Sequence, residues 1–140
     1  MSESDRLKNL IRISDIELDA DEISPLGLAY IGDAIFEILV RMHSLSLGNA
    51  PVAKLHKMSR AFVNAKAQSD LYFRLADVLT EKEQAVFKRG RNAKSNTIPK
   101  NAEILDYKHA TGIEAVFGYL YIKGEIDRIV WLFNEGTKEN

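Results

Sequence analysis

The sequence contains no cysteine and little proline or glycine, and these absences exclude several classes of protein. With no cysteine among 140 residues, disulfides, iron–sulfur clusters, thiolate zinc sites and a cysteine nucleophile are excluded. Three prolines and eight glycines argue against a loop-rich sandwich or a collagen-like chain. The formal net charge is −1, so a surface for a polyanion has to come from local clustering of basic residues.

Long apolar runs are also missing. No run approaches the roughly 20 residues that a membrane helix needs, and the first 24 residues, with seven acidic and three basic side chains, hold no apolar core of the signal-peptide kind. We therefore expect a cytoplasmic protein with no membrane partner. We expect an acidic lead-in over residues 1–24, its apolar side chains (Leu18 among them) laid against the body. One folded domain over 25–135 and a short polar tail over 136–140 should follow.

The distribution of apolar residues predicts an all-α fold. Ser24-Pro25 is typical of a helix start, and the residues that follow to about 47 are apolar on nearly all sides, as in a buried central helix. Further helices are expected over 52–58, from a Ser59 cap through 75, from a Thr80–Glu83 capping box to about 88, from an Asn101 cap through 122, and after Gly124. Residues 88–100 read as a loop or a frayed helix end. The prediction is a bundle of six or seven helices around the central one.

Two carboxylates lie inside the two most apolar helices. Asp33 follows Gly32 in the middle of the central helix, and Glu114 stands in the apolar stretch 112–118. An ionised carboxylate in such a place is costly unless it is paired or binds a cation. One interpretation is that each pairs with a Lys or Arg from a neighbouring helix. The other is that the two helices pack side by side and both carboxylates hold Mg²⁺, which takes oxygen ligands from one or two carboxylates, water and substrate phosphates.

Basic residues gather in two segments. No acidic residue occurs from 86 to 100, where the candidates for contact with a polyanion are Lys88, Arg89, Arg91, Asn92 and Lys94. A second strip at near-helical spacing consists of His56, Lys57, Arg60 and Lys66. Such side chains suit contacts to phosphate and sugar, although a solvated turn has the same composition. The three histidines lack the spacing of metal ligands.

The two acidic helices and the basic segment between them resemble the ribonuclease III family. The run 28–37, LAYIGDAIFE, resembles the signature helix of ribonuclease III domains, and 113–120, IEAVFGYL, resembles the family's second acidic helix. The segment 87–95, FKRGRNAKS, looks like that of the short bacterial subclass called mini-ribonuclease III, whose nuclease domain stands without a double-stranded-RNA-binding domain. The resemblance covers about residues 25–135 and implies a ribonuclease III endonuclease-domain-like helical bundle.

The resemblance also implies an activity. It implies a homodimeric endonuclease that cleaves double-stranded RNA with Mg²⁺ and, for the mini subclass, matures the precursor of large-subunit (23S) ribosomal RNA, with a large-subunit ribosomal protein as a candidate partner. By position, Asp33 and Glu114 match the catalytic, metal-binding carboxylates. Where the general family has two further carboxylates, this chain has Ala29 and Thr111, and the mini subclass is similar in lacking both. The cautious expectation is one tightly held Mg²⁺ per site.

Two further expectations concern assembly and the rival function. The central helix is apolar on more faces than a small domain readily covers, which predicts a dimer interface built from Tyr30, Phe36, Leu39 and Val40, joined by Trp131 of the last helix. The alternative function is a non-catalytic RNA-binding module of the same fold in ribosome assembly. The absence of carboxylates at 29 and 111 favours this alternative, and the presence of Asp33 and Glu114 opposes it.

Overall fold

The computed structural model is all-helical in the part of the chain that it describes, residues 2, 17–94 and 103–138. Within those residues it has six helices: α2 (Pro25–Ser46), α3 (Val52–Arg60), α4 (Ala65–Leu75), α5 (Glu81–Asn92), α6 (Ile104–Ile122) and α7 (Ile126–Thr137). None of these helices is long and apolar enough to cross a membrane. The predicted all-α class is confirmed.

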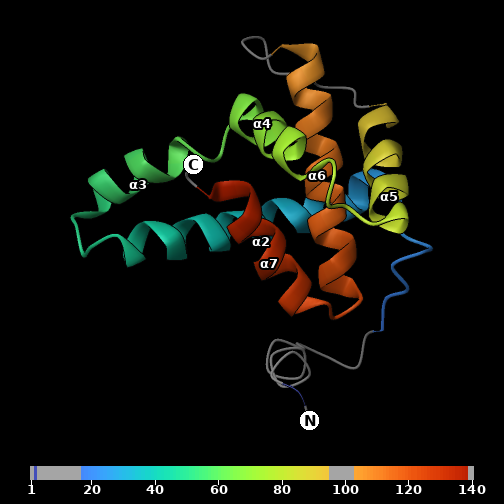
Figure 1. Ribbon diagram of the computed structural model, residues 1–140, viewed down its shortest axis with the longest axis horizontal. Coiled ribbons are helices and arrows are strands. Elements are labelled where there is room, and N and C mark those ends of the chain that lie inside the picture. The colour runs from blue at the N-terminus through green and yellow to red at the C-terminus, as the bar shows by residue number, and fades with distance from the viewer. Residues whose placement is uncertain (1, 3–16, 95–102, 139–140) are drawn as a thin grey trace.

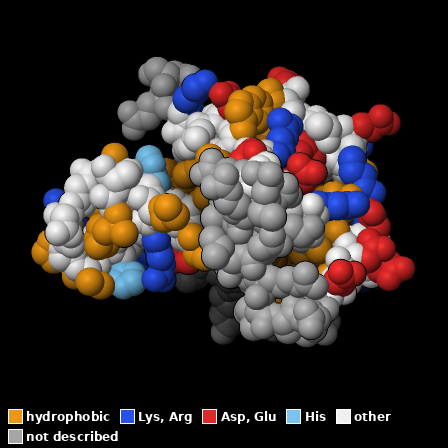
Figure 2. Space-filling view, turned by 90° about the horizontal axis from the view of Figure 1, so that it is seen from below, with side chains coloured by type: hydrophobic (Ala, Val, Ile, Leu, Met, Phe, Trp, Pro, Cys, Tyr) orange, Lys and Arg blue, Asp and Glu red, His pale blue; other side chains and the backbone are white. Residues whose placement is uncertain are grey.

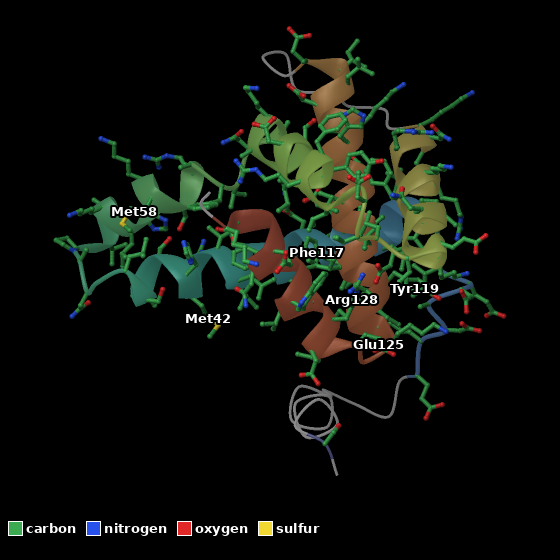
Figure 3. The ribbon with its side chains drawn as sticks, in the orientation of Figure 1. Met42, Met58, Phe117, Tyr119, Glu125 and Arg128 are labelled. Atoms are coloured by element: carbon green, nitrogen blue, oxygen red, sulfur yellow. The ribbon has the colours of Figure 1, made fainter. Side chains whose placement is uncertain are left out.

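The centre of the fold is the crossing of α2 and α6 (Figure 1). Helices α4 and α5 flank α6, and α7 turns back from the end of α6 across α2, while α3 and the C-terminal half of α2 form an arm at the other side. At the crossing, the ring of Phe36 lies 5.7 Å from that of Phe117 and 5.9 Å from that of Phe133, centroid to centroid. Phe117 occupies this centre in Figure 3. The predicted buried central helix is therefore α2, with α6 as its main partner.

Glycines bring the backbones of α2 and α6 into direct contact. A Cβ atom on Gly32 of α2 would collide with the backbone carbonyl of Glu114, and a Cβ on Gly118 of α6 would collide with the backbone carbonyl of Leu28. Both glycines are buried. Only residues without a side chain permit this approach, so the crossing point of the two helices is fixed to within a residue.

Local signals account for most helix starts, with one error. Ser24 caps α2 by accepting a hydrogen bond from the Gly27 amide (3.1 Å), and the Thr80–Glu83 capping box of α5 is present in both directions. The predicted cap at Ser59 is wrong. Ser59 lies inside α3, buried, with its Oγ 3.3 Å from Ser44 Oγ of α2. The next helix starts instead at Asn64, whose Oδ1 accepts from the Ala67 amide at 2.8 Å.

The helix α5 extends further than predicted. Residues 88–92 were expected in a loop or a frayed helix end, and the structure continues the regular helix to Asn92. The reason lies in packing: Phe87 is fully buried, and Gly90 faces Gly112 and Ala115 of α6 at close range. Burial against α6 outweighs the weak helix propensity of this segment. The expected cap at Asn101 and the rest of the segment, 95–100, lie outside the described residues.

The lead-in is attached to the body by a polar tie rather than by an apolar stripe. Leu18, expected against the body, is 57% exposed, while Ala20 is buried in the core. Asp21 accepts a hydrogen bond from the hydroxyl of Tyr119 (3.1 Å) and pairs with Lys82 and Lys123 at 3.0 and 3.2 Å. Hydrogen bonds from these lysines and then from Tyr119 lower the pKa of Asp21 to about 2. Residues 10–16, also expected on the body, lie outside the described part of the chain.

Helix α2 exposes large apolar side chains, as predicted, but these are not all the residues that were predicted. Phe36 and Val40 are buried within the domain, which corrects their assignment to an interface, and Leu39 is half-buried. Tyr30 is 80% exposed, as expected of an unpaired face. The other large apolar side chains exposed on α2 are Leu26, Ile38, Met42 and Leu45. Figure 3 shows Met42 projecting from α2 away from the rest of the domain.

Replacing Gly32 with alanine should destabilise the protein by about 3 kcal/mol or more, because the new Cβ forces α2 and α6 apart along their whole contact. Urea denaturation followed by circular dichroism measures this loss. The matched control is Gly27→Ala in the first turn of the same helix. A Cβ there meets only the ends of the Ile23 and Ser24 side chains, so its cost should stay below about 1 kcal/mol. Equal stability of Gly32→Ala and wild type would contradict the close crossing.

Candidate active site

Asp33 and Glu114 meet at the crossing of α2 and α6. Gly32 rests on the backbone carbonyl of Glu114, so the next residue along α2, Asp33, lies beside the Glu114 side chain. The two carboxyl groups are within hydrogen-bonding reach of each other. Asp33 is exposed at the surface, and Glu114 is partly covered by the surrounding helices. The structure thus brings together the two carboxylates that the sequence singled out.

Burial and the neighbouring charge hold Glu114 in its protonated form. Burial is the main cause that raises the pKa of Glu114, to about 8, and the hydrogen bond and the charge of Asp33 raise it further. Among the described residues no Lys or Arg forms an ion pair with either carboxylate. The described part of the chain therefore does not support the interpretation that Asp33 and Glu114 each pair with a basic residue. The proton on Glu114 takes the place of a cation.

A third polar side chain, Gln68 of α4, reaches the same place. Its amide lies beside the Glu114 carboxyl, where it lowers the pKa of that group and so partly opposes burial. Gln68 is only 5% exposed. The sequence reasoning missed Gln68. A single glutamine in an amphipathic helix carries no signal in spacing or charge that would have indicated it.

Packing between α4 and α6 holds Gln68 over Glu114. The hydroxyl of Ser69, the next residue, is 3.0 Å from Nδ1 of His109 on α6. The Tyr72 ring stacks on the Phe87 ring of α5 at 3.6 Å between centroids, and the His109 ring stacks on Tyr72 at 5.6 Å. His109 is thus a packing residue, as expected of a histidine without metal-ligand spacing. These contacts pack α4, α5 and α6 together next to the two carboxylates.

Two other positions border the site and carry no carboxylate. Ala29 lies one turn before Asp33, and Thr111 lies one turn before Glu114, so both share a helix face with a site residue. Both are buried, and the Thr111 hydroxyl donates to the backbone carbonyl of Tyr107 at 3.0 Å. Thr111 is satisfied within its own helix. The donor set at the crossing is therefore the two carboxylates and the Gln68 amide.

This donor set fits a hard divalent cation. Mg²⁺ is commonly held by one or two carboxylates, with water and substrate phosphates completing its octahedron. No group of three or more His, Asp or Glu side chains with metal-binding geometry occurs in the described residues, so a cage made only of protein ligands is not formed there. Two carboxylates without an ion-pair partner among the described residues suit such an ion.

The two basic segments lie apart in one chain. Lys88, Arg89, Asn92 and Lys94 are exposed at the C-terminal end of α5, and Arg91 packs over the Phe87 ring at 5.9 Å. His56, Lys57 and Arg60 are exposed on α3, in the arm at the opposite side of Figure 1, and Lys66 is exposed at the start of α4. Lys66 is within 3.8 Å of Asp70, an exposed pair worth little. The structure does not merge the two segments into one patch within a chain.

Comparison with known proteins identifies the family. Residues 26–125 match the family model of the ribonuclease III domain. A crystal structure of a Fusobacterium nucleatum protein superposes with a TM-score of 0.77 at 34% identity, covering 84% of this chain and 96% of that one. The chain therefore belongs to the ribonuclease III family, and it has the family's all-helical fold and the family's action on double-stranded RNA.

Within the family, its relatives define the subclass. A mini-ribonuclease 3 of Clostridium tetani is 50% identical over 79% of this chain and 74% of its own length. The mini-ribonuclease 3 of a Thermoanaerobacter species is 47% identical over 76% and 75%, and that of Enterococcus faecalis 43% over 83% and 89%. The chain belongs to the mini-ribonuclease III subclass and is a ribonuclease III-type endoribonuclease.

The raised pKa of Glu114 predicts how the stability of the metal-free protein depends on pH. The folded state keeps its proton up to about pH 8, whereas an unfolded glutamate loses it near 4.5, so stability falls as pH rises between these values. Glu114→Gln removes this loss. At pH 8.5 the variant should be more stable than wild type by about 2–4 kcal/mol, and near pH 4.5 the two should be equal.

Chemical denaturation in EDTA at a series of pH values measures this difference. The control is Glu135→Gln on α7, whose carboxylate pairs only with Lys138 at the surface and should give a pH-independent difference near zero. A constant stability difference between Glu114→Gln and wild type from pH 5 to 8.5 would show that Glu114 is ionised throughout.

Proposed function

We propose that this protein is a Mg²⁺-dependent homodimeric endoribonuclease that matures the precursor of large-subunit ribosomal RNA in the bacterial cytoplasm. The observation that carries the proposal is the meeting of Asp33 and Glu114, with no basic partner among the described residues, at the crossing of the family's two acidic helices. The relatives named mini-ribonuclease 3 support an RNA substrate.

Asp33 and Glu114 would hold the metal ion through their carboxylate oxygens. An ion held there would supply activation of water and stabilisation of negative charge on the phosphate. Glu114 has to lose its proton when the ion binds, because the proton and the cation compete for the same oxygens. Asp33, exposed at the surface, faces the side from which a phosphodiester can approach. The products carry 5′-phosphate and 3′-hydroxyl ends.

The basic segments are the proposed contacts to the RNA backbone. Double-stranded RNA is recognised mainly through its A-form shape, its phosphates and its 2′-hydroxyls. The exposed end of α5 and the exposed side of α3 supply cations for such contacts at two separate places. A protein that relies on phosphate contacts binds in a salt-dependent manner. A large-subunit ribosomal protein is the proposed partner that selects one site on the precursor.

The exposed apolar face of α2 supports a two-fold dimer. Tyr30 and Ile38 stand on the same helix as Asp33, before and after it, and both are largely exposed. Figure 2 shows exposed hydrophobic side chains spread over the arm formed by α3 and the C-terminal half of α2. Each chain holds one Asp33–Glu114 pair, so cutting both strands requires two copies. A self-complementary interface through α2 supplies the second site from the same gene.

Replacing either carboxylate should abolish cleavage without unfolding the protein. Asp33→Asn and Glu114→Gln each remove a metal-binding oxygen and should lower kcat by about 10³-fold or more. Cleavage of a structured ribosomal RNA precursor with Mg²⁺, followed by mapping of the product ends, measures the loss. The control is Asp127→Asn in the exposed first turn of α7, which should cut at the wild-type rate. An Asp33→Asn variant of full activity would refute the site.

A charge in the apolar face of α2 should dissociate the dimer. Ile38 is 55% exposed in the middle of that face, and Ile38→Glu buries two like charges at a two-fold interface, which should raise the dimer dissociation constant by about 100-fold or more. Light scattering at micromolar concentration measures the mass. Leu105→Glu, on a leucine that is 68% exposed in the first turn of α6, is the control and should remain dimeric. A wild-type protein of monomer mass that still cuts both strands would contradict the paired-site mechanism.

A further inference from the structure

The junction of α4 with α6 exposes two large apolar side chains that neither the active site nor the apolar face of α2 uses. Phe73 of α4 is 62% exposed, and its ring meets the His109 ring of α6 edge-on at 5.1 Å between centroids. Leu105, 68% exposed, stands one turn before His109 on the same side of α6. Exposed apolar side chains that gather in one place mark interaction sites.

Carboxylates border these apolar side chains. Asp70 stands one turn before Phe73, and Asp77 stands one turn after it; both are exposed. Asp106, which is half-buried, follows Leu105. We call these five residues the Phe73 surface. Its negative charge repels a phosphate backbone and attracts a cationic partner.

The cations of α4 do not neutralise the Phe73 surface. Arg74 is directed to α7, where its Nη1 donates to the backbone carbonyl of Gly136 at 3.1 Å. Lys66 lies 3.8 Å from Asp70, in an exposed pair that is worth little. The other two carboxylates of the surface form no ion pair with a Lys or Arg of the described residues.

A small pocket adjoins the Phe73 surface. It has a volume of about 240 Å³, and its lining includes Asp70 and Arg74 with the apolar side chains of Phe36, Phe62 and Leu71. This volume is below that of ordinary cofactor sites and suits a single side chain. Because Asp70 belongs to both, the pocket and the Phe73 surface are continuous, and a polypeptide lying on one can place a side chain in the other.

We propose that the Phe73 surface docks a basic polypeptide segment of a partner protein. An apolar side chain of that segment packs on Phe73 and Leu105, and its Lys or Arg side chains pair with the carboxylates. The inference rests on the proposed function, in which a protein partner selects the cleavage site, and adds where that partner binds and by which chemistry. RNA and partner then occupy surfaces of opposite charge, so the enzyme can hold both at once.

A synthetic octapeptide, Lys-Lys-Leu-Lys-Lys-Phe-Lys-Lys, serves as the probe. Fluorescence anisotropy of the labelled peptide, titrated with the full-length protein without RNA, should give a dissociation constant below about 100 μM. Octalysine should bind about 10-fold more weakly, because it lacks the apolar side chains. Phe73→Ser and Asp77→Lys should each raise the dissociation constant of the probe by about 10-fold. Asp77→Lys tests the surface without altering the contact of Phe73 with His109.

Matched controls make the same changes elsewhere. Leu47→Ser replaces a side chain that is 65% exposed at the end of α2, and Asp127→Lys reverses an exposed charge in the first turn of α7. Both should bind the probe as wild type does. Phe73→Ser and Asp77→Lys should cut the RNA precursor alone at the wild-type rate, because neither residue belongs to the active site or to the basic segments.

Several results would overturn this inference. Wild-type affinity for the probe in Phe73→Ser or in Asp77→Lys would do so, as would equal affinity of octalysine and probe. Loss of double-stranded RNA binding in Phe73→Ser would make the surface an RNA contact, and a monomer mass of that variant in light scattering would make it an interface between two copies. Probe binding is measured without cleavage, and Asp33→Asn should bind the probe as wild type does. Failure of the proposed active site is therefore distinguishable from failure of the docking surface.

Discussion

The contact between the backbones of α2 and α6 is the constraint on which the rest of the structure depends. Gly32 and Gly118 allow the two helices to touch at two points, and these contacts fix both the crossing position and the rotation of each helix about its axis. Asp33 follows Gly32, and Gly32 rests on the backbone carbonyl of Glu114. The contact that closes the core therefore also brings the two carboxylates together. The stability of the core and the geometry of the proposed site therefore depend on the same contact.

Two carboxylates of the domain have opposite surroundings. Glu83 accepts two hydrogen bonds from Arg128 at 2.8 and 3.0 Å. Burial alone would raise the pKa of Glu83, but hydrogen bonds from Arg128 and Thr80 and the Arg128 charge lower it on balance. Glu114 is partly buried and has no ion-pair partner among the described residues, and its pKa is raised. The contrast separates a carboxylate that joins two helices from one that the proposed function assigns to a ligand.

How far the sequence predicts this structure depends on whether a feature is local. Ser24 and the Thr80–Glu83 box cap their helices through contacts within one turn, and both were predicted. Asp33 and Glu114 were found because a charge inside an apolar helix is itself an anomaly. The predicted end of α5 was wrong because contact with α6 keeps Gly90 in the helix. The predicted helix cap at Ser59 was wrong because the Ser59 hydroxyl contacts Ser44 of α2 instead. The position of Gln68 could not be predicted for the same reason, because only tertiary packing brings its amide beside Glu114.

The polar tie at Asp21 has a consequence for the order in which the chain folds. Asp21 and Tyr119 are 98 residues apart in the sequence, and the contact of Gly32 with α6 likewise joins the first helix of the domain to the last but one. Pairings between distant segments form after a large loss of chain entropy, and they slow folding relative to bundles made of neighbouring helices. Asp33 also leaves the ribosome long before Glu114, so a chain of which only the first half has emerged lacks one of the two carboxylates of the proposed site. That site can form only after α6 has been synthesised.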